Sequence, residues 1–502
     1  MTHTDPADVS VELSKHITML LPAYRLAGPS GSLQRKLIDS ASTDTDGASI
    51  LGHHRSYVSP SFSTIVSKTS VLGQVIDYLG ARDVIIVQLW CRSMKRRMRK
   101  VVLHLRVQPW ESAVIAYLRR QNDAIYSNGG PSYQFSLDKL RALQLMELRD
   151  DGASQFSSAI SSGFIDQLQA LQVQCSPSMQ LGYLRALMEA FTPRSLPKLR
   201  SLDLSGSKLG DEIVVDIATM FKRGQLAGLE SFSLASNAVQ DAGCRKLVAA
   251  LCHSDCRAKL RSLNLNGNLI ANEGARALFN GLTSECLAGL RWLHLGDNLI
   301  PAGAIVENLS KAIQSRSCLK WQTIDLGLNS EVGDEGLFSL FEKIGGRDLC
   351  SGLRQIKVQS TNMGDIAAEA LGVILASGTC KKLSTLDVST NAISLVGARH
   401  LFEGFEGCPQ LKSFSIANND IGGEGFRILS DALIKGHGRK LERLDVSYTN
   451  YSTGIQLIAR AIAQLCCPNL RELGVLDHSR SGTEIAQIFR ACKHMNSLRL
   501  KS

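Results

Sequence analysis

Apolar residues recur along the chain in a unit whose clearest copy is LRSLNLNGNLIANEGARAL, from Leu260 to Leu278. Counted from Leu260 as position 1, leucines stand at positions 1, 4 and 6, an asparagine stands at position 9, and Gly274 opens an apolar helical pattern. In a short strand, successive side chains point to opposite faces, so positions 4 and 6 share the inner face and positions 3, 5 and 7 the outer face. The unit predicts a strand, a turn and a helix.

The unit recurs with a period of about 28–32 residues, except for a shorter last step, which is typical of a solenoid of stacked units. One strand cannot bury its apolar face alone, whereas stacked strands form a parallel sheet with a continuous core. We therefore expect about thirteen repeats over residues 137–502. They begin at Leu140, Leu168, Leu199, Leu229, Leu260, Leu290, Trp321, Leu353, Leu383, Leu411, Leu441, Leu470 and Met495.

Two small residues recur where the chain turns away from the strand. A turned-in asparagine amide can pair with the backbone of the next coil, and a glycine permits tight turns and close coil packing. Both are expected to be structural. The position-9 asparagines are Asn237, Asn268, Asn298, Asn329, Asn391 and Asn419, and Ser207, Thr361 and Thr449 replace them elsewhere; the more degenerate end repeats carry Leu148, Ser176 and His478 there. The glycines are Gly243, Gly274, Gly303, Gly336, Gly397, Gly425 and Gly454.

This pattern resembles the ribonuclease-inhibitor-like subfamily of leucine-rich repeats from about residue 137 to the C-terminus. The resemblance implies an α/β horseshoe with parallel strands on the concave face and helices on the convex face. Degenerate end repeats are expected because a solenoid must cap its own ends.

The N-terminal part divides into three segments. Residues 1–60 are rich in Ser, Thr, Gly and Asp, and we expect them to be flexible. Residues 61–100 contain two short amphipathic helices, which should pack on each other and on a further surface. Residues 101–136 form a cap or linker with an expected edge strand, VVLHLRV.

The two helices resemble an F-box at Tyr78-Leu79, Arg82-Asp83-Val84, Leu89, Cys91-Arg92 and Arg96-Arg97, although the usual Leu-Pro at the start is absent. The resemblance implies a small N-terminal head that binds a Skp-family adaptor and, through it, a cullin scaffold. The alternative is a cap over the open end of the solenoid core. The expected adaptor-binding residues are Val75, Ile76, Leu79, Val84, Val87 and Leu89.

The net charge and the cysteine positions bear on the kind of partner and on the cellular compartment. The net charge of +10 permits nucleic-acid or acidic partners without requiring them, and nucleic acid is not the expected partner. Eight of the thirteen cysteines stand three or four residues before a repeat start, which suits a small buried hydrophobe better than a disulfide. Reduced thiols favour the cytoplasm or nucleus. The basic run from Lys95 to Lys100 fits either a nuclear-localisation patch or the solvated face of a helix. No apolar run is long enough to span a membrane.

No catalytic motif is present: the chain lacks a phosphate-binding Gly-Lys-Ser/Thr loop, a G-x-S-x-G elbow and a His-Glu-x-x-His helix. Asp203, Asp325, Asp387 and Asp445 all occupy position 5, where they are better explained as spaced concave-face residues than as an acidic active site. Neither an enzyme activity nor a metal or cofactor is expected.

A rigid concave sheet is suited to binding a protein partner. Most outward positions hold small polar residues, and the bulky or charged exceptions are the expected contacts. The expected partner-binding residues are Trp292, His294, Asp297, Asp325, Gln355, Lys357, Arg443, Asp445 and Tyr448.

The leading functional hypothesis is a substrate-recruiting F-box subunit of an SCF-type ubiquitin ligase, with an unknown target protein. One alternative is a scaffold or inhibitor without a link to ubiquitin. A further alternative is a Ran GTPase-activating protein, whose repeats are similar. Such proteins usually begin with the repeats and end in an acidic tail, whereas this chain ends Arg-Leu-Lys-Ser.

Overall fold

The computed structural model describes residues 103–107, 140–161, 163, 165–253, 259–284, 286–314, 320–345, 351–450, 454–476 and 499–501. The chain divides into two compact units, Met1–Val101 and Val102–Ser502, and all described residues belong to the second. The predicted adaptor-binding residues, from Val75 to Leu89, lie outside the described residues. So do the basic run and the segments 1–60 and 61–100, whose predictions therefore stay predictions.

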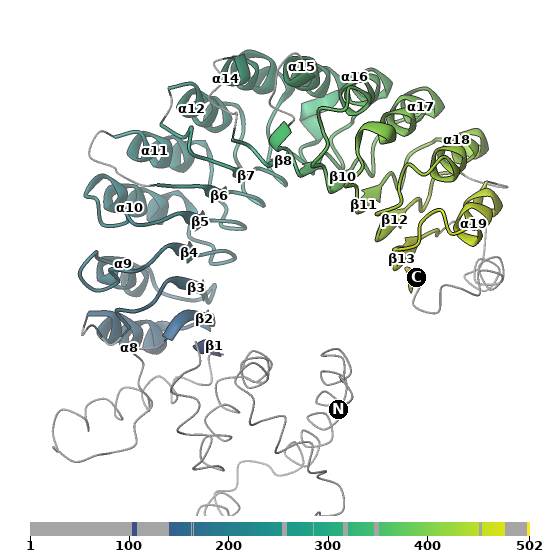
Figure 1. Cartoon of the computed structure of the whole chain (residues 1–502). Helices are drawn as coiled ribbons and strands as arrows, with labels where there is room; N and C mark the ends of the chain where they lie inside the picture. Colours follow the sequence, from purple (N-terminus) through teal and green to yellow (C-terminus); the bar gives the residue numbers. More distant parts are fainter. Residues whose placement is uncertain are drawn as a thin grey trace, which may run out of the picture. The chain divides into compact units, whose positions relative to one another are not determined.

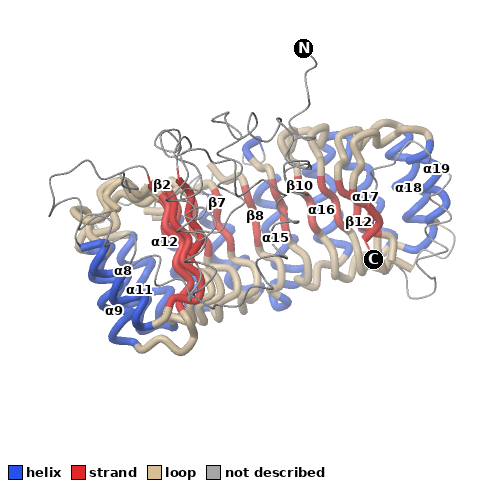
Figure 2. The backbone as a smooth tube through the Cα atoms, turned by 90° about the horizontal axis from the view of Figure 1, so that it is seen from below, coloured by secondary structure: helices blue, strands red, loops and turns tan. Residues whose placement is uncertain are grey.

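Within the described residues, one sheet of fourteen parallel strands follows the chain, and each strand pairs with its neighbours in sequence. The expected edge strand is present as β1, which pairs with β2. Figure 2 shows the strands side by side across the array. The strands are β1 Leu103–Val107, β2 Leu140–Leu148, β3 Ala170–Cys175, β4 Ser201–Asp203, β5 Ser231–Ser233, β6 Ser262–Asn264, β7 Trp292–His294, β8 Thr323–Asp325, β9 Gln355–Lys357, β10 Thr385–Asp387, β11 Ser413–Ser415, β12 Arg443–Asp445, β13 Glu472–Gly474 and β14 Arg499–Lys501.

Helices alternate with these strands and lie on the outer side of the curved array, while the strands line its inner side (Figure 1). This arrangement confirms the predicted solenoid with parallel strands on the concave face and helices on the convex face. The helices are α8 Asp150–Ser161, α9 Leu181–Ala190, α10 Gly210–Lys222, α11 Asp241–Leu251, α12 Asn272–Thr283, α13 Ala302–Ala304, α14 Ser310–Gln314, α15 Gly333–Gly345, α16 Asp365–Ala376, α17 Leu395–Glu403, α18 Gly422–Ile434 and α19 Ile455–Ala463. A π-helical turn, Ile305–Leu309, joins α13 to α14, and 3-10 turns span Ser330–Val332 and Gly404–Gly407.

The predicted register holds from β4 to β13, where each strand occupies positions 3–5 of its repeat. In the Leu260 repeat, Leu263 and Leu265 are both fully buried and Leu260 is 6% exposed. Complete burial of a leucine side chain contributes about 1.5–3 kcal/mol relative to leaving it exposed. The stacked leucine rows therefore form the continuous core that the unit predicts.

The register predicted for the last repeat is wrong. Leu473 at position 4 pairs with Leu500, which the start at Met495 had placed at position 6. The paired strand therefore lies two residues later than the apolar spacing predicts, because M-x-x-L-x-L and the shorter L-x-L offer the same alternation in two frames.

A second correction concerns the Leu168 repeat. Ser176 was expected at the asparagine position, but the backbone N–H of Cys175 donates to Ser207 Oγ at 2.9 Å, as position 9 does in the repeats that follow. Cys175 is 1% exposed and pairs with Leu148 across a bulge. The turn of this repeat is thus one residue shorter than the others.

The position-9 asparagines join neighbouring coils, but they bond the backbone of the preceding coil and not, as expected, that of the next coil. The side-chain oxygen of Asn268 accepts the N–H groups of Asn237 and Val239 in the preceding repeat, at 3.1 and 3.0 Å. Its amide nitrogen donates to the carbonyls of Leu234 and Leu265 at 3.0 and 2.8 Å. Asn268 is 4% exposed, so these bonds satisfy backbone groups that water cannot reach.

Threonine interrupts this row twice. The hydroxyls of Thr361 and Thr449 donate to carbonyls of their own repeats, Val358 and Val446, each at 2.7 Å. Both threonines are fully buried. In the part of the chain that the structure describes, neither hydroxyl bonds the preceding repeat, so the side-chain link between coils is missing at these two places. The backbone N–H groups of Gly333 and Gly422 still donate to the carbonyls of Thr361 and Thr449.

In several repeats, an aspartate of the neighbouring coil caps the following helix. Asp241 Oδ1 accepts the N–H groups of Ala271 and Gly274 at 2.7 and 2.9 Å, at the start of α12. Asp334 and Asp365 do the same for α16 and α17. Helix N-termini favour such carboxylates because their first N–H groups have no partner within the helix.

This cap explains the recurring glycine. A Cβ on Gly274 would lie 2.6 Å from Asp241 Oδ1 and 2.8 Å from Ile270 Cγ2. Gly303 differs, because a Cβ there would meet nothing within 4 Å. The glycine is therefore a packing requirement at Gly274 and not at Gly303.

The cysteines of the described part are free thiols. Cys380, Cys408 and Cys467, three residues before a repeat start, are at most 3% exposed, as the repeat pattern predicts. Cys286, four residues before a start, was expected to be buried with them but is exposed. Leu287, three residues before the start, fills the buried position instead.

Candidate functional site

The inner face of the sheet carries mostly small polar side chains, and Trp292 on β7 is the large exception. Trp292 occupies position 3 and is partly exposed, whereas Trp321 at position 1 is 6% exposed and fills the core, as expected. Tyr448 is 38% exposed at position 8. Its φ of 56° and the 54° of Asp297 place both in the left-handed region, which recurs at position 8 from Gly206 to Tyr448.

Three of the four position-5 aspartates bond their own turns. Asp203, Asp387 and Asp445 each accept the backbone N–H of a serine two residues later, at 2.9, 3.1 and 3.2 Å. This is an Asx turn, in which a short carboxylate caps the chain as it leaves the strand. These aspartates therefore have a structural use.

Asp325 is the exception: in the described residues it forms no such turn bond, and position 7 of its repeat is Gly327 instead of serine. A Cβ on Gly327 would collide with the amide of Gln359, and a Cβ on Gly296 in the preceding repeat would lie 3.0 Å from Asp325 Oδ1. Gly296 thus leaves room beside the Asp325 carboxylate, whereas Gly327 leaves room for the Gln359 amide.

The carboxylate of Asp325 contacts side chains from three other strands or turns. Its Oδ2 lies 3.0 Å from His294 Nδ1, 3.9 Å from Lys357 Nζ and 3.4 Å from Asn266 Nδ2. His294, Asp325 and Lys357 stand at position 5 of three adjacent strands, β7, β8 and β9. We refer to these three residues as the charged cluster.

Electrostatics in the charged cluster favour an ionised Asp325. The residue is 5% exposed, and burial by itself would raise the pKa of its carboxyl group. The hydrogen bond with His294 and the charge of Lys357 outweigh burial and lower the pKa below its ordinary value of 3.8. A buried carboxylate therefore lies beneath a histidine and a lysine that remain partly open to solvent.

The structure brings together some of the predicted partner-binding residues. Trp292, His294, Asp325, Gln355 and Lys357 lie on three adjacent strands, and Asp325 is covered by its two neighbours. Asp297 is exposed at the end of the β7 turn.

Arg443, Asp445 and Tyr448 belong to a separate place on the face. Their strand, β12, lies three strands beyond β9, which corresponds to about 14–15 Å across the sheet at the usual strand spacing. Arg443 is exposed, and a Cβ on Gly474 of the next strand would collide with the Asp445 carboxylate.

Sequence reasoning missed Asn266 and Gly296, which both lie beside the Asp325 carboxylate. A signal was available, because position 7 is glycine in the Leu290 and Trp321 repeats but serine after the other three position-5 aspartates. In the described residues, no group of three or more His, Cys, Asp or Glu side chains is arranged to hold a metal ion. None of the described helices is both long and apolar enough to span a membrane.

Sequence comparison supports the repeat assignment. The family model described as "Leucine Rich repeat" matches residues 195–218 and 258–279. The ribonuclease inhibitor of Sus scrofa is 27% identical over 278 residues, which cover 50% of this chain and 58% of that protein. NACHT, LRR and PYD domains-containing protein 5 of Homo sapiens is 25% identical over 317 residues, 61% of this chain and 24% of that protein. The chain thus matches 58% or less of the length of these curated relatives.

A solved structure, the Rad7 and Elc1 complex in yeast, is similar to this chain with a TM-score of 0.43 and 14% sequence identity. The match covers 99% of this chain and 98% of that chain. The fold assignment itself rests on the sheet and helices described above. With the repeat match and the curated relatives, it establishes that the chain is a leucine-rich-repeat protein with homology to ribonuclease inhibitor.

Proposed function

We propose that the chain recruits a target protein to an SCF-type ubiquitin ligase. In this proposal, residues 70–98 bind a Skp-family adaptor on a cullin scaffold, and the concave face binds the target. Leucine-rich-repeat proteins with this homology generally act as protein-binding scaffolds.

The observation that carries target binding is the position of Trp292 beside the charged cluster. A partly exposed tryptophan supplies a large contact area at low conformational cost, and such residues dominate the energetics of protein interfaces. The buried Asp325 carboxylate bonds His294 and forms an ion pair with Lys357, so the polar groups around Trp292 are ordered before a partner arrives.

Support for the adaptor-binding part comes from the sequence. The helical pattern of residues 70–98, with Tyr78-Leu79, Asp83 and Cys91-Arg92 at F-box-like spacing, motivates this half of the proposal.

The first arm of the test is co-purification of the full chain with a Skp-family adaptor. Wild type should retain the adaptor, and Leu79→Lys should lose it. Leu299→Lys is a matched control, because Leu299 is 50% exposed on the repeats and can accept a charge without burying it. If the adaptor co-purified with none of the three proteins, ligase recruitment would be refuted. The chain would then be a scaffold that acts without ubiquitin.

The second arm concerns the target. Trp292→Ala should release proteins that co-purify with the wild-type chain, while Tyr183→Ala, which truncates a 36% exposed aromatic residue on α9, should retain them. The released proteins should be ubiquitinated in cells that express wild type and not in cells that express Leu79→Lys. Release by both alanine variants alike would show that the concave face is not the target site.

A further inference from the structure

A second charged surface lies at the edge where the strands begin. Position 1 of each repeat is an apolar core residue, so its neighbours at positions 0 and 2 point outward, and we call these residues of β4–β13 the strand-start edge. The edge contains only two acids, Glu230 and Glu442. Its basic residues are Lys198, Arg200, Lys259, Arg261, Arg291, Lys320, Arg354, Lys382, Lys412, Lys440 and Arg471.

The opposite edge of the sheet has no such excess. Between the Leu199 and Leu441 repeats, positions 8 and 10 contain one basic residue, Lys208, and two acids, Asp297 and Asp420. The positive charge is therefore concentrated along one edge rather than spread evenly over the repeats.

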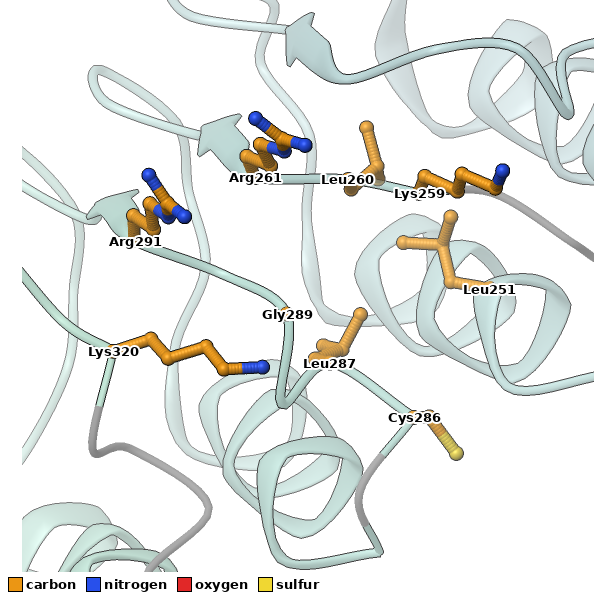
Figure 3. A pocket seen from close by; sticks show the side chains of 9 residues that line it. All are labelled: Leu251, Lys259, Leu260, Arg261, Cys286, Leu287, Gly289, Arg291 and Lys320. Carbon is orange, nitrogen blue, oxygen red and sulfur yellow. The ribbon is translucent and has the colours of Figure 1, made fainter.

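The charge is densest around a hollow between the Leu260, Leu290 and Trp321 repeats. This hollow has a volume of about 310 Å³, and Lys259, Arg261, Arg291 and Lys320 line it together with apolar side chains and, among the described residues, no carboxylate. Figure 3 shows Arg261 and Arg291 at the starts of neighbouring strands, with Lys320 extending from the next coil.

The basic groups around the hollow have few acidic partners. Arg261 pairs with Glu230, with 3.5 Å between Nε and Oε2, and Glu230 also faces Arg200 at 3.9 Å. Across the described ranges, Lys259, Arg291 and Lys320 form no ion pair. Like charges gathered in this way repel one another, and an anion bound among them would relieve that repulsion.

We propose that the strand-start edge, centred on this hollow, binds an acidic segment of a partner polypeptide. The edge has no aromatic side chain on which unpaired bases could stack, which disfavours single-stranded nucleic acid. Glu230 and Glu442 already pair with Arg261 and Lys412, so they interrupt the row. An interrupted row suits the separated carboxylates of a flexible acidic segment better than the continuous charge of a nucleic-acid duplex.

The test measures binding of a fluorescein-labelled oligoglutamate peptide to the purified full chain by fluorescence anisotropy. The variant Arg261→Gln/Arg291→Gln/Lys320→Gln should bind about tenfold more weakly, since each exposed ion pair contributes little and three are removed. Wild-type binding should weaken as salt is added, because exposed charges are screened.

The matched control is Arg245→Gln/Arg276→Gln/Lys311→Gln. It removes the same three side-chain types from exposed positions on α11, α12 and α14, away from the strand-start edge. It should retain wild-type affinity, and thermal unfolding should show both triple variants folded. Equal losses in both variants, or no loss in the edge variant, would overturn the proposal.

A duplex DNA oligonucleotide serves as the competing probe. If it binds more tightly than oligoglutamate and depends on the same three cations, the edge is a nucleic-acid surface and the proposal is wrong. This assay needs no adaptor and no concave-face target, and Trp292→Ala should not alter it. Its outcome is therefore independent of ligase recruitment.

Discussion

His294 Nδ1 lies 3.0 Å from Asp325 Oδ2 on the adjacent strand, so this position-5 aspartate bonds a side chain of the preceding repeat. Asp325 lacks the serine that bonds Asp203, Asp387 and Asp445 in their turns. The same residue type at the same position thus has a local role in three repeats and joins three repeats in the fourth.

The charged cluster should make stability depend on acid pH. The pKa of Asp325 is lower in the folded chain than its ordinary value of 3.8, so its stabilising effect is present above about pH 4 and is lost as pH falls through the folded pKa. The difference in unfolding temperature between wild type and Asp325→Asn should therefore shrink on acidification below pH 4. Asp203→Asn, which removes a carboxylate bonded to Ser205, measures the background. A constant difference across the acid range would contradict the expectation.

Removing the other partner should also destabilise the chain. His294→Ala should cost about 1.5–3 kcal/mol, the usual range for a hydrogen bond to a charged group. Urea unfolding at neutral pH measures this cost. An unchanged midpoint would show that His294 does not support the buried carboxylate.

Replacement of a buried position-9 asparagine should cause a large loss of stability. Asn268→Ala should lower the free energy of unfolding by about 3 kcal/mol, because it leaves several buried backbone groups without partners. Asn264→Ala is the control, since Asn264 is partly exposed and its side chain accepts one turn hydrogen bond, from Asn266 N–H at 3.1 Å. The control should cost about 1 kcal/mol in the same urea titration. Equal costs for the two variants would refute the role of the row.

Two glycine substitutions should have opposite effects. Gly274→Ala should destabilise the chain by about 1–3 kcal/mol, because its Cβ would meet the Asp241 carboxylate. Gly303→Ala has open space and should be neutral or stabilise α13 by up to about 1 kcal/mol. Thermal unfolding of the two variants compares them directly, and a loss at Gly303 as large as at Gly274 would contradict the packing explanation.

Cysteine reactivity should follow burial. Burial, with smaller contributions from the charges of Asp241 and Asp211, raises the pKa of the Cys244 thiol to about 12, so little reactive thiolate forms at neutral pH. Cys286 is exposed and should be alkylated in the native chain. Iodoacetamide labelling followed by peptide mass spectrometry should find label on Cys286 before urea is added and on Cys244 only afterwards. Early label on Cys244 would show that α11 opens readily.

Local pattern was enough to predict most of the array. The spacing of Leu260, Leu263 and Leu265 fixed the inner face of β6, and Asn268 fixed the place where the chain turns. These features are local, so each repeat can be read independently. At the last repeat, two frames fit the alternation equally, and only the pairing of Leu473 with Leu500 distinguishes them.

The charged cluster could be predicted only in part. Trp292, His294 and Lys357 were visible as unusual outward residues, but burial of Asp325 depends on which side chains leave space in neighbouring coils. Gly296 in the preceding repeat supplies that space, and a periodic pattern within one repeat does not reveal it. The strand-start edge was missed for a similar reason, because its charges gather only when equivalent positions of many repeats are aligned.

The threonine at position 361 gives the array a seam. The Trp321 and Leu353 repeats lack the buried asparagine link, as do the Leu411 and Leu441 repeats at Thr449. The Lys357–Asp325 contact spans the first of these two junctions. Under mechanical tension the solenoid should part there sooner than at an asparagine-linked junction. A partner that contacts both His294 and Lys357 would connect the repeats on the two sides of that junction. Binding on the concave face would therefore increase the force needed to separate them.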